Sequence, residues 1–236
     1  MNLTRKYYSL SFKIISAVII LTGIIWNMID PWGTHQLTGF AVFMFYTLQS
    51  NLLVLGVFIG LIVRDIKDIK LLSNGKTLDH SKTLIYRIQA ASVVAIVLTF
   101  LVFWALLAPP VFSPDSELKP LSLLYFSNIS IHLLSAILMT ADFFVFSPRK
   151  TIKKTDIYFY LIIPFYYLVF ATIAGFAGMV YRTGADGNPV RFPYGFMDYD
   201  RSGAMVIPWF VGLALLYFGM SFLLFIIDNK IIKNKQ

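Results

Sequence analysis

Four polar residues fall within a short apolar stretch, FYTLQSNLLV at residues 45–54, and one of them could act as a nucleophile. If the stretch is helical, Thr47, Ser50 and Asn51 share one face and Gln49 points the other way, because residues three and four apart lie on the same side. A threonine hydroxyl becomes a nucleophile when a base takes its proton. The chain contains no cysteine, so Thr47 with a nearby base is the simplest catalytic group available.

His132 is the histidine best placed to supply that base. His35 and His80 are expected in loops, whereas His132 lies within a second apolar stretch and shares a helical face with Asn128. A buried imidazole stays neutral and can accept a proton. A Thr–His pair that could carry out acyl transfer is therefore the simplest catalytic arrangement that the pattern offers.

Neighbouring polar residues could support the same reaction. Asn51, Asn128 or Ser50 would donate hydrogen bonds to the oxyanion of an acyl-transfer intermediate. The same residue types also join transmembrane helices without any catalytic role. Two further interpretations therefore stay open, a small-solute or proton transporter that uses the same polar residues and a non-catalytic lipid-binding protein.

Asp142 is an acidic residue within the same apolar stretch as His132, and the transporter interpretation would use it. It follows His132 by ten residues, about 15 Å along a helix, which is too far to orient the imidazole directly. We expect it to pair at the cytoplasmic boundary, where Arg149 and Lys150 are close in sequence.

Composition identifies the class of protein that must hold these residues. The chain of 236 residues is 58% hydrophobic and 14% charged, with a mean hydropathy of +0.72, whereas soluble domains are about 25% charged. The basic residues lie between apolar runs, so the net charge of +8 does not predict a nucleic-acid partner. The segment DYDRSG begins like a calcium loop, but Trp209 stands where the bidentate glutamate belongs. We expect no metal and no cofactor.

Six apolar runs are each long enough to cross a bilayer as a helix. They lie near 11–30, 38–63, 84–108, 121–146, 157–181 and 205–227. The fold class predicted is an all-α polytopic bundle forming one domain over residues 1–236. With these spans, 16 of the 20 Lys and Arg residues fall on one side, which places both termini in the cytoplasm.

The longest outer loop, about 182–204, is rich in Gly, Pro, Asp and Tyr. Long loops of this kind often cover or bind a ligand, although a solvated connector fits equally well. Arg182, Arg191 and Arg201, with Asp198 beside them, could form a rim that holds a substrate carboxylate.

The predicted spans place the Thr–His pair at one depth. The second and fourth spans both enter from the outer side. Counted from positions 38 and 121, Thr47 lies about 14 Å deep and His132 about 16 Å deep, at about 1.5 Å per residue. The two side chains are therefore expected to meet near the middle of the bilayer.

Three motifs, in this order and spacing, resemble a known family. They are FYTLQSN at 45–51, NISIH at 128–132 followed by AD at 141–142, and FPYGFMD at 192–198. The family comprises the androgen-induced and androgen-dependent tissue-factor-pathway-inhibitor-regulating proteins and related bacterial six-helix membrane proteins.

This resemblance implies an intramembrane threonine hydrolase of lipid esters, notably fatty acid esters of hydroxy fatty acids. It implies that Thr47 is the nucleophile and His132 the catalytic base, with a membrane lipid or fatty acid ester as substrate. It favours the bacterial branch and hence the bacterial cytoplasmic membrane. This chain has Ala136 and Gly195 where bacterial relatives often have proline. The sequence does not indicate the oligomeric state.

Overall fold

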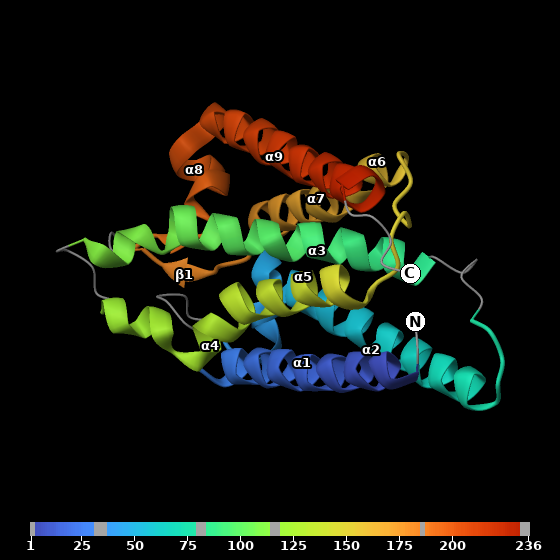
Figure 1. Cartoon of the computed structure of the whole chain (residues 1–236). Helices are drawn as coiled ribbons and strands as arrows, with labels where there is room; N and C mark the ends of the chain where they lie inside the picture. Colours follow the sequence, from blue (N-terminus) through green and yellow to red (C-terminus); the bar gives the residue numbers. More distant parts are fainter. Residues whose placement is uncertain (1–2, 31–36, 79–83, 114–118, 185–186, 232–236) are drawn as a thin grey trace.

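Six helical stretches run side by side through the molecule (Figure 1). The computed structural model describes residues 3–30, 37–78, 84–113, 119–184 and 187–231, so His35 and His80 lie outside the described residues. All six stretches are long and apolar enough to cross a membrane: Leu3–Ile29, Tyr46–Ser73, Leu84–Phe112, Phe126–Phe146, Asp156–Phe176 and Tyr199–Lys230. The chain is a multi-pass membrane protein, and the predicted all-α fold is confirmed.

Several of these stretches combine more than one kind of helix. The α-helices are α1 Leu3–Ile29, α2 Tyr46–Ser73, α3 Leu84–Val102, α4 Phe126–Ile129, α5 Ser135–Phe146, α6 Asp156–Tyr160, α7 Ile162–Phe176, α8 Tyr199–Ser202 and α9 Val206–Ile226. The 3-10 segments are η1 Gly39–Met44, η3 Pro109–Phe112, η4 Pro120–Leu124, η6 Gly195–Met197 and η7 Gly203–Met205. The π-helical turns are η2 Phe103–Leu107, η5 Ser130–Leu134 and η8 Ile227–Ile231. A short antiparallel hairpin pairs β1 Arg182–Thr183 with β2 Pro189–Val190.

The breaks have local causes. The fifth crossing is interrupted at Leu161, because Pro164 lacks an N–H and its ring clashes with the carbonyl four residues earlier, that of Tyr160. The second crossing was predicted to begin at residue 38, but its α-helix begins at Tyr46. Phe45 adopts an extended conformation and separates η1 from α2.

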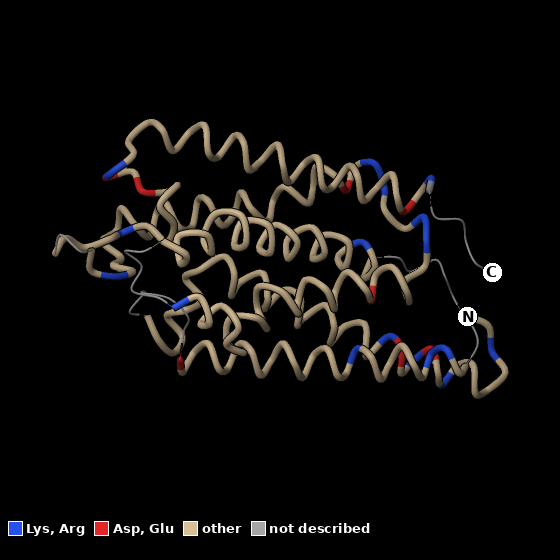
Figure 2. Tube along the Cα trace, turned by 60° about the vertical axis from the view of Figure 1, so that its left-hand side comes forward, with Lys and Arg blue, Asp and Glu red and all other residues tan. Residues whose placement is uncertain are grey.

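The bundle has two ends that differ in content. The loop end carries the described residues of the 182–204 loop, 182–184 and 187–204, and the terminal end is where α1 begins and α9 ends (Figure 1). Most of the described Lys and Arg residues lie at the terminal end (Figure 2).

Helices α1 and α3 both pack against α2. Helix α1 also contacts α4, η5 and α5. A Cβ atom on Gly23 of α1 would lie 2.3 Å from Ser130 Oγ, so glycine allows α1 to approach η5 closely. Helix α9 packs on α3 and α6, at the side of the bundle away from α1 (Figure 1).

A buried network of charges joins three helices near the terminal end. Lys6 of α1 pairs with Asp65 at 2.6 Å and with Asp68 at 2.7 Å, both on α2. Lys13 pairs with Asp65 at 2.9 Å and with Asp142 of α5 at 3.1 Å. All five side chains are at most 5% exposed. The opposite charges compensate one another, which allows ionised groups to remain inside an apolar bundle.

The expected partners of Asp142 were wrong. Asp142 pairs with Lys13 and accepts a hydrogen bond from Gln89 Nε2 at 2.8 Å. Arg149 instead lies 3.9 Å from Asp228. Sequence proximity suggested Arg149, but α1 packs on α5 and brings a lysine from a distant part of the chain.

Candidate active site

Thr47 lies in the first turn of α2, facing the interior of the bundle. Because α2 begins at Tyr46 rather than at residue 38, Thr47 is next to a helix N-terminus instead of in the middle of a longer helix. Gln49 Nε2 donates to the Phe43 carbonyl at 2.8 Å. This bond links α2 to the end of η1 and explains why a polar side chain lies on the other face.

His132 contacts Thr47 directly, with Nε2 3.4 Å from Thr47 Oγ1. Its other ring nitrogen, Nδ1, lies 3.1 Å from the carbonyl oxygen of Asn128. A carbonyl only accepts, so Nδ1 carries the proton and Nε2 offers a lone pair toward Thr47. The 3.4 Å contact is long for a hydrogen bond, as is common in catalytic pairs before substrate binds.

The imidazole is also held by a ring that the sequence analysis did not single out. Phe103 stacks on His132 with centroids 3.7 Å apart and planes inclined by 21°. Both residues belong to π-helical turns, η2 and η5. In these turns Ala108 N–H bonds to the Phe103 carbonyl and Ser135 N–H to the Ser130 carbonyl, each five residues back. Such turns are rare and are often found at functional sites.

Asn51 connects the helix turn that carries Thr47 to η5, the segment that carries His132. Its Nδ2 donates to the Thr47 carbonyl at 2.7 Å and to the Ile131 carbonyl at 2.9 Å. Both amide hydrogens are therefore engaged by carbonyls, one on α2 and one on η5. The structure does not support the expected oxyanion role of Asn51 and assigns it a positioning contact.

The other two expected oxyanion donors are engaged in the same way. Ser50 Oγ donates to the Thr47 carbonyl at 2.9 Å and also lies 2.8 Å from Thr99 Oγ1. Asn128 Nδ2 donates to the Leu123 carbonyl at 2.8 Å. These bonds fix the segments on either side of the Thr–His pair.

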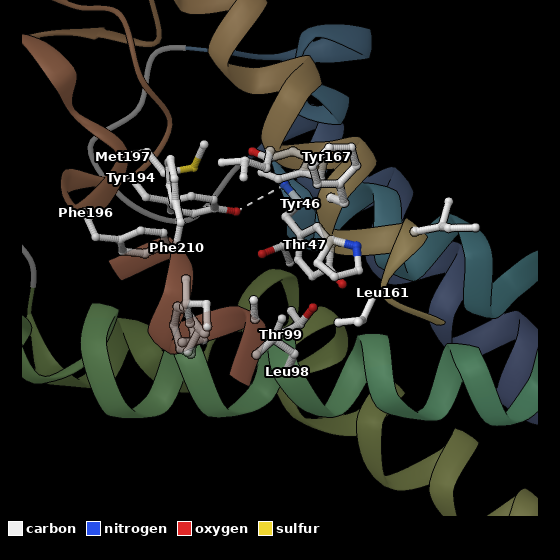
Figure 3. A pocket seen from close by; sticks show the side chains of 18 of the residues that line it. Tyr46, Thr47, Leu98, Thr99, Leu161, Tyr167, Tyr194, Phe196, Met197 and Phe210 are labelled. Carbon is white, nitrogen blue, oxygen red and sulfur yellow. Dashed lines mark hydrogen bonds between the residues drawn. The ribbon is translucent and has the colours of Figure 1, made fainter. Parts of the chain in front are cut away.

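A cavity of about 370 Å³ lies against Thr47 (Figure 3). Its lining comes from α2, α3, η2, α6, α7, the 182–204 loop and α9. Among the described residues that line it, none is charged. Tyr158, Ile162 and Phe165 line it and are 59–66% exposed on the outer surface of the bundle. The cavity therefore opens sideways on the apolar surface, where α6 and α7 face α9.

The 182–204 loop forms the end wall of this cavity. Phe192 and Met197 are buried at 1% and 2% exposure, and Tyr194, Phe196 and Met197 line the cavity (Figure 3). A Cβ atom on Gly175 of α7 would lie 2.3 Å from the Phe192 ring, so glycine lets the loop rest on α7.

Tyr194 brings a hydroxyl from this loop to the beginning of α2. The Tyr46 N–H donates to the Tyr194 hydroxyl at 3.1 Å (Figure 3). Burial raises the pKa of Tyr194, and hydrogen bonding with the side chain and main chain of Thr47 partly opposes that rise. Sequence analysis did not single out Tyr194. The available signal was its place in FPYGFMD, one of the motifs carrying the family resemblance.

The expected carboxylate-binding rim is not at the cavity. Among the residues that line it there is no Arg182, Arg191, Arg201 or Asp198. Arg191 pairs with Asp200, and hydrogen bonding with that carboxylate raises the pKa of Arg191.

Asp198 has a structural task at the start of α8. Its carboxylate accepts hydrogen bonds from the N–H groups of Asp200 and Arg201. Arg201 Nε in turn lies 3.6 Å from Asp198 Oδ2. A side-chain cap of this kind stabilises a helix N-terminus, so Asp198 shapes the loop without facing the cavity.

Fold and site together define a class, a six-helix membrane protein with a Thr–His contact beside a cavity that opens to the apolar surface. No family model, no curated protein and no solved structure matches the chain. Among the described residues, no group of three or more His, Cys, Asp or Glu side chains could hold a metal ion.

Proposed function

We propose that this protein is an intramembrane hydrolase of lipid esters, with Thr47 as nucleophile and His132 as general base. One observation carries the proposal: His132 Nε2 faces Thr47 Oγ1 at 3.4 Å while Nδ1 is held by the Asn128 carbonyl. A nucleophile, a base and a group that orients the base form the arrangement used in covalent hydrolysis. Here the orienting group is a main-chain carbonyl.

The reaction would run in two halves. His132 Nε2 takes the Thr47 proton as Oγ1 attacks the ester carbonyl, and the tetrahedral intermediate collapses as His132 returns that proton to the leaving alcohol. Water then attacks the acyl-threonine and gives its proton to His132. The carboxylic acid leaves, and the proton returns to Thr47.

The cavity supports a substrate with a long apolar chain. Its described lining has no charged side chain and it opens on the surface that faces hydrocarbon, so a lipid can enter sideways from the bilayer. The family resemblance favours fatty acid esters of hydroxy fatty acids within this class. An apolar cavity gives little support to transport of a polar solute or a proton.

The arrangement of charge supports an orientation for this hydrolase. Most of the described Lys and Arg residues lie at the terminal end (Figure 2), and short basic segments face the cytoplasm. We therefore propose that both termini are cytoplasmic, that the 182–204 loop is on the outer side, and that the host membrane is a bacterial cytoplasmic membrane.

The test uses the full chain purified into lipid nanodiscs. Hydrolysis of long-chain p-nitrophenyl esters and labelling by a fluorophosphonate probe should both occur. Thr47→Ala and His132→Ala should each lower kcat by about 10³-fold or more, since each removes one member of the catalytic unit. Peptide mapping should place the probe on Thr47.

A matched control separates loss of the nucleophile from loss of a threonine in general. Thr172 of α7 lies 3.4 Å from the Tyr199 hydroxyl and does not line the cavity. Thr172→Ala should keep full hydrolysis and labelling. Unchanged hydrolysis and labelling in Thr47→Ala would refute the proposal, and a non-catalytic lipid-binding protein would then be the better interpretation.

A further inference from the structure

The Tyr194 hydroxyl occupies a specific place between the nucleophile and the cavity. The ring is held by Phe196, which stacks on it at 5.2 Å and 10°, and by Phe45 at 6.2 Å and Tyr167 at 6.3 Å. These contacts fix the phenol on three sides, so its oxygen is directed at the first turn of α2 (Figure 3).

The first turn of α2 also favours negative charge. Tyr46 is the first residue of this helix, and the first N–H groups of a helix have no carbonyl partner within it. They form the positive end of the helix dipole. Tyr46 N–H donates to the Tyr194 oxygen, so the phenol is held beside Thr47, where an oxyanion would form at the positive end of the helix.

Two other hydroxyl groups around the cavity donate to main-chain carbonyls. Tyr167 donates to the Met44 carbonyl at 3.0 Å and Thr99 to the Ala95 carbonyl at 3.2 Å. The Tyr46 hydroxyl is buried without a partner among the described residues. Tyr158 is on the exposed side of the cavity, beside Phe218.

The amide and serine donors that the sequence suggested are also committed to main-chain carbonyls. Tyr194 differs from them because its oxygen accepts from Tyr46 N–H, and a phenol that accepts a hydrogen bond can still donate its own proton.

We propose that Tyr194 is a further catalytic residue, whose hydroxyl donates a hydrogen bond to the oxyanion formed when Thr47 attacks the ester. The inference rests on the proposed hydrolase function. The carbonyl π electrons move to oxygen as the Oγ1–carbon bond forms, and the Tyr194 O–H stabilises that charge without giving up its proton. When the intermediate collapses, the electrons return and the ester C–O bond breaks.

The protonation state of Tyr194 is consistent with this role. Burial raises the pKa of Tyr194 above its ordinary value, so the phenol keeps its proton at neutral pH. A protonated phenol is a donor, whereas a phenolate would repel the developing negative charge.

Tyr194→Phe tests the proposal, because it keeps the ring and removes the hydroxyl. In nanodiscs, kcat should fall by about 10²–10³-fold, as for loss of one oxyanion donor, while KM changes less than about threefold. The rate of fluorophosphonate labelling should fall in parallel, since the phosphoryl oxygen develops the same charge. A control, Tyr199→Phe, removes a half-buried phenol of α8 that does not line the cavity and should leave kcat unchanged.

Three outcomes would overturn the role of Tyr194: a kcat within about threefold of the parent, a rise confined to KM, or a labelling rate that does not change. If Tyr194→Phe does not fold, 4-aminophenylalanine at position 194 provides the test, because its amino group keeps a hydrogen-bond donor at this place. It should retain at least about a tenth of the parent kcat, and an inactive folded protein would refute the proposal. Thr47→Ala distinguishes the hydrolase function from the role of Tyr194, since its residual activity tests the hydrolase function alone.

Discussion

The Lys13–Asp142 pair predicts a specific pattern of stability in three variants: Lys13→Met, Asp142→Asn and the double substitution. With Arg64, which lies 3.0 Å from Asp68, the network holds three basic and three acidic side chains, so each single change leaves one charge unbalanced. Lys13 is 2.9 Å from Asp65 and 3.1 Å from Asp142, and Asp142 also has Gln89, so neither partner is left without contacts.

The expected loss of stability follows from these remaining contacts. Removing one member of a buried pair costs about 3–5 kcal/mol, and the surviving contacts favour the lower end, about 3 kcal/mol for each single variant. The double variant restores neutrality, and its stability should lie within about 1 kcal/mol of the parent. The coupling energy between the two sites should then be about 3 kcal/mol or more.

Thermal unfolding in detergent provides the measurement. A loss of about 3 kcal/mol corresponds to a fall in Tm of about 6–12 °C for a chain of this size, so both single variants should be distinct from the double variant. Additive losses, with the double variant the least stable of the three, would refute the reasoning. Ester hydrolysis at a temperature where Asp142→Asn is folded should be unchanged, because Asp142 is about 15 Å from His132 along the helix. Loss of activity in that folded variant would instead favour the transporter interpretation.

Two other predictions concern positioning. Asn51→Leu removes two hydrogen bonds, and each of the two carbonyls keeps a bond from a serine. The variant should therefore lose only about 1–2 kcal/mol of stability, yet its kcat should fall by about 10²-fold because the Thr–His pair is misplaced. An unchanged kcat would show that the Asn51 hydrogen bonds are not needed for catalysis. Gly175→Ala places a Cβ 2.3 Å from the Phe192 ring and should shift the loop that carries Tyr194, lowering kcat by about tenfold. Gly219→Ala, where no atom lies within 4 Å of the new Cβ, is its control, and equal activity of the two would contradict the prediction.

The crossings and the Thr–His contact could be predicted because they depend on simple periodicities. Six runs of about 20 apolar residues predict six membrane helices. Equal depth on two spans that run in the same direction predicts that Thr47 and His132 meet. The contact is present although α2 begins at Tyr46 rather than at residue 38, whereas the depth of the pair in the bilayer stays a prediction.

The remaining features depend on contacts between distant segments or on departures from regular helix. The π-helical turns at Phe103 and His132 have no pattern that hydropathy reveals. Tyr194 reaches Thr47 because the 182–204 loop folds back on α7, and Lys13 reaches Asp142 because α1 packs against α5. The oxyanion roles expected of Asn51, Ser50 and Asn128 have no support in the structure, because these side chains donate hydrogen bonds to nearby main-chain carbonyls.

Because the cavity opens on the apolar side of the bundle, the relevant measure of substrate concentration is the one within the membrane. A lipid substrate of the proposed hydrolase would diffuse in two dimensions before it entered between α6 or α7 and α9, so its binding would depend on its mole fraction in the membrane rather than on its amount per litre. At a fixed total quantity of substrate, added inert phospholipid or detergent lowers the mole fraction of substrate in the membrane and should slow the reaction. The aqueous solubility of the substrate then matters little, and the composition of the surrounding bilayer becomes part of the kinetics.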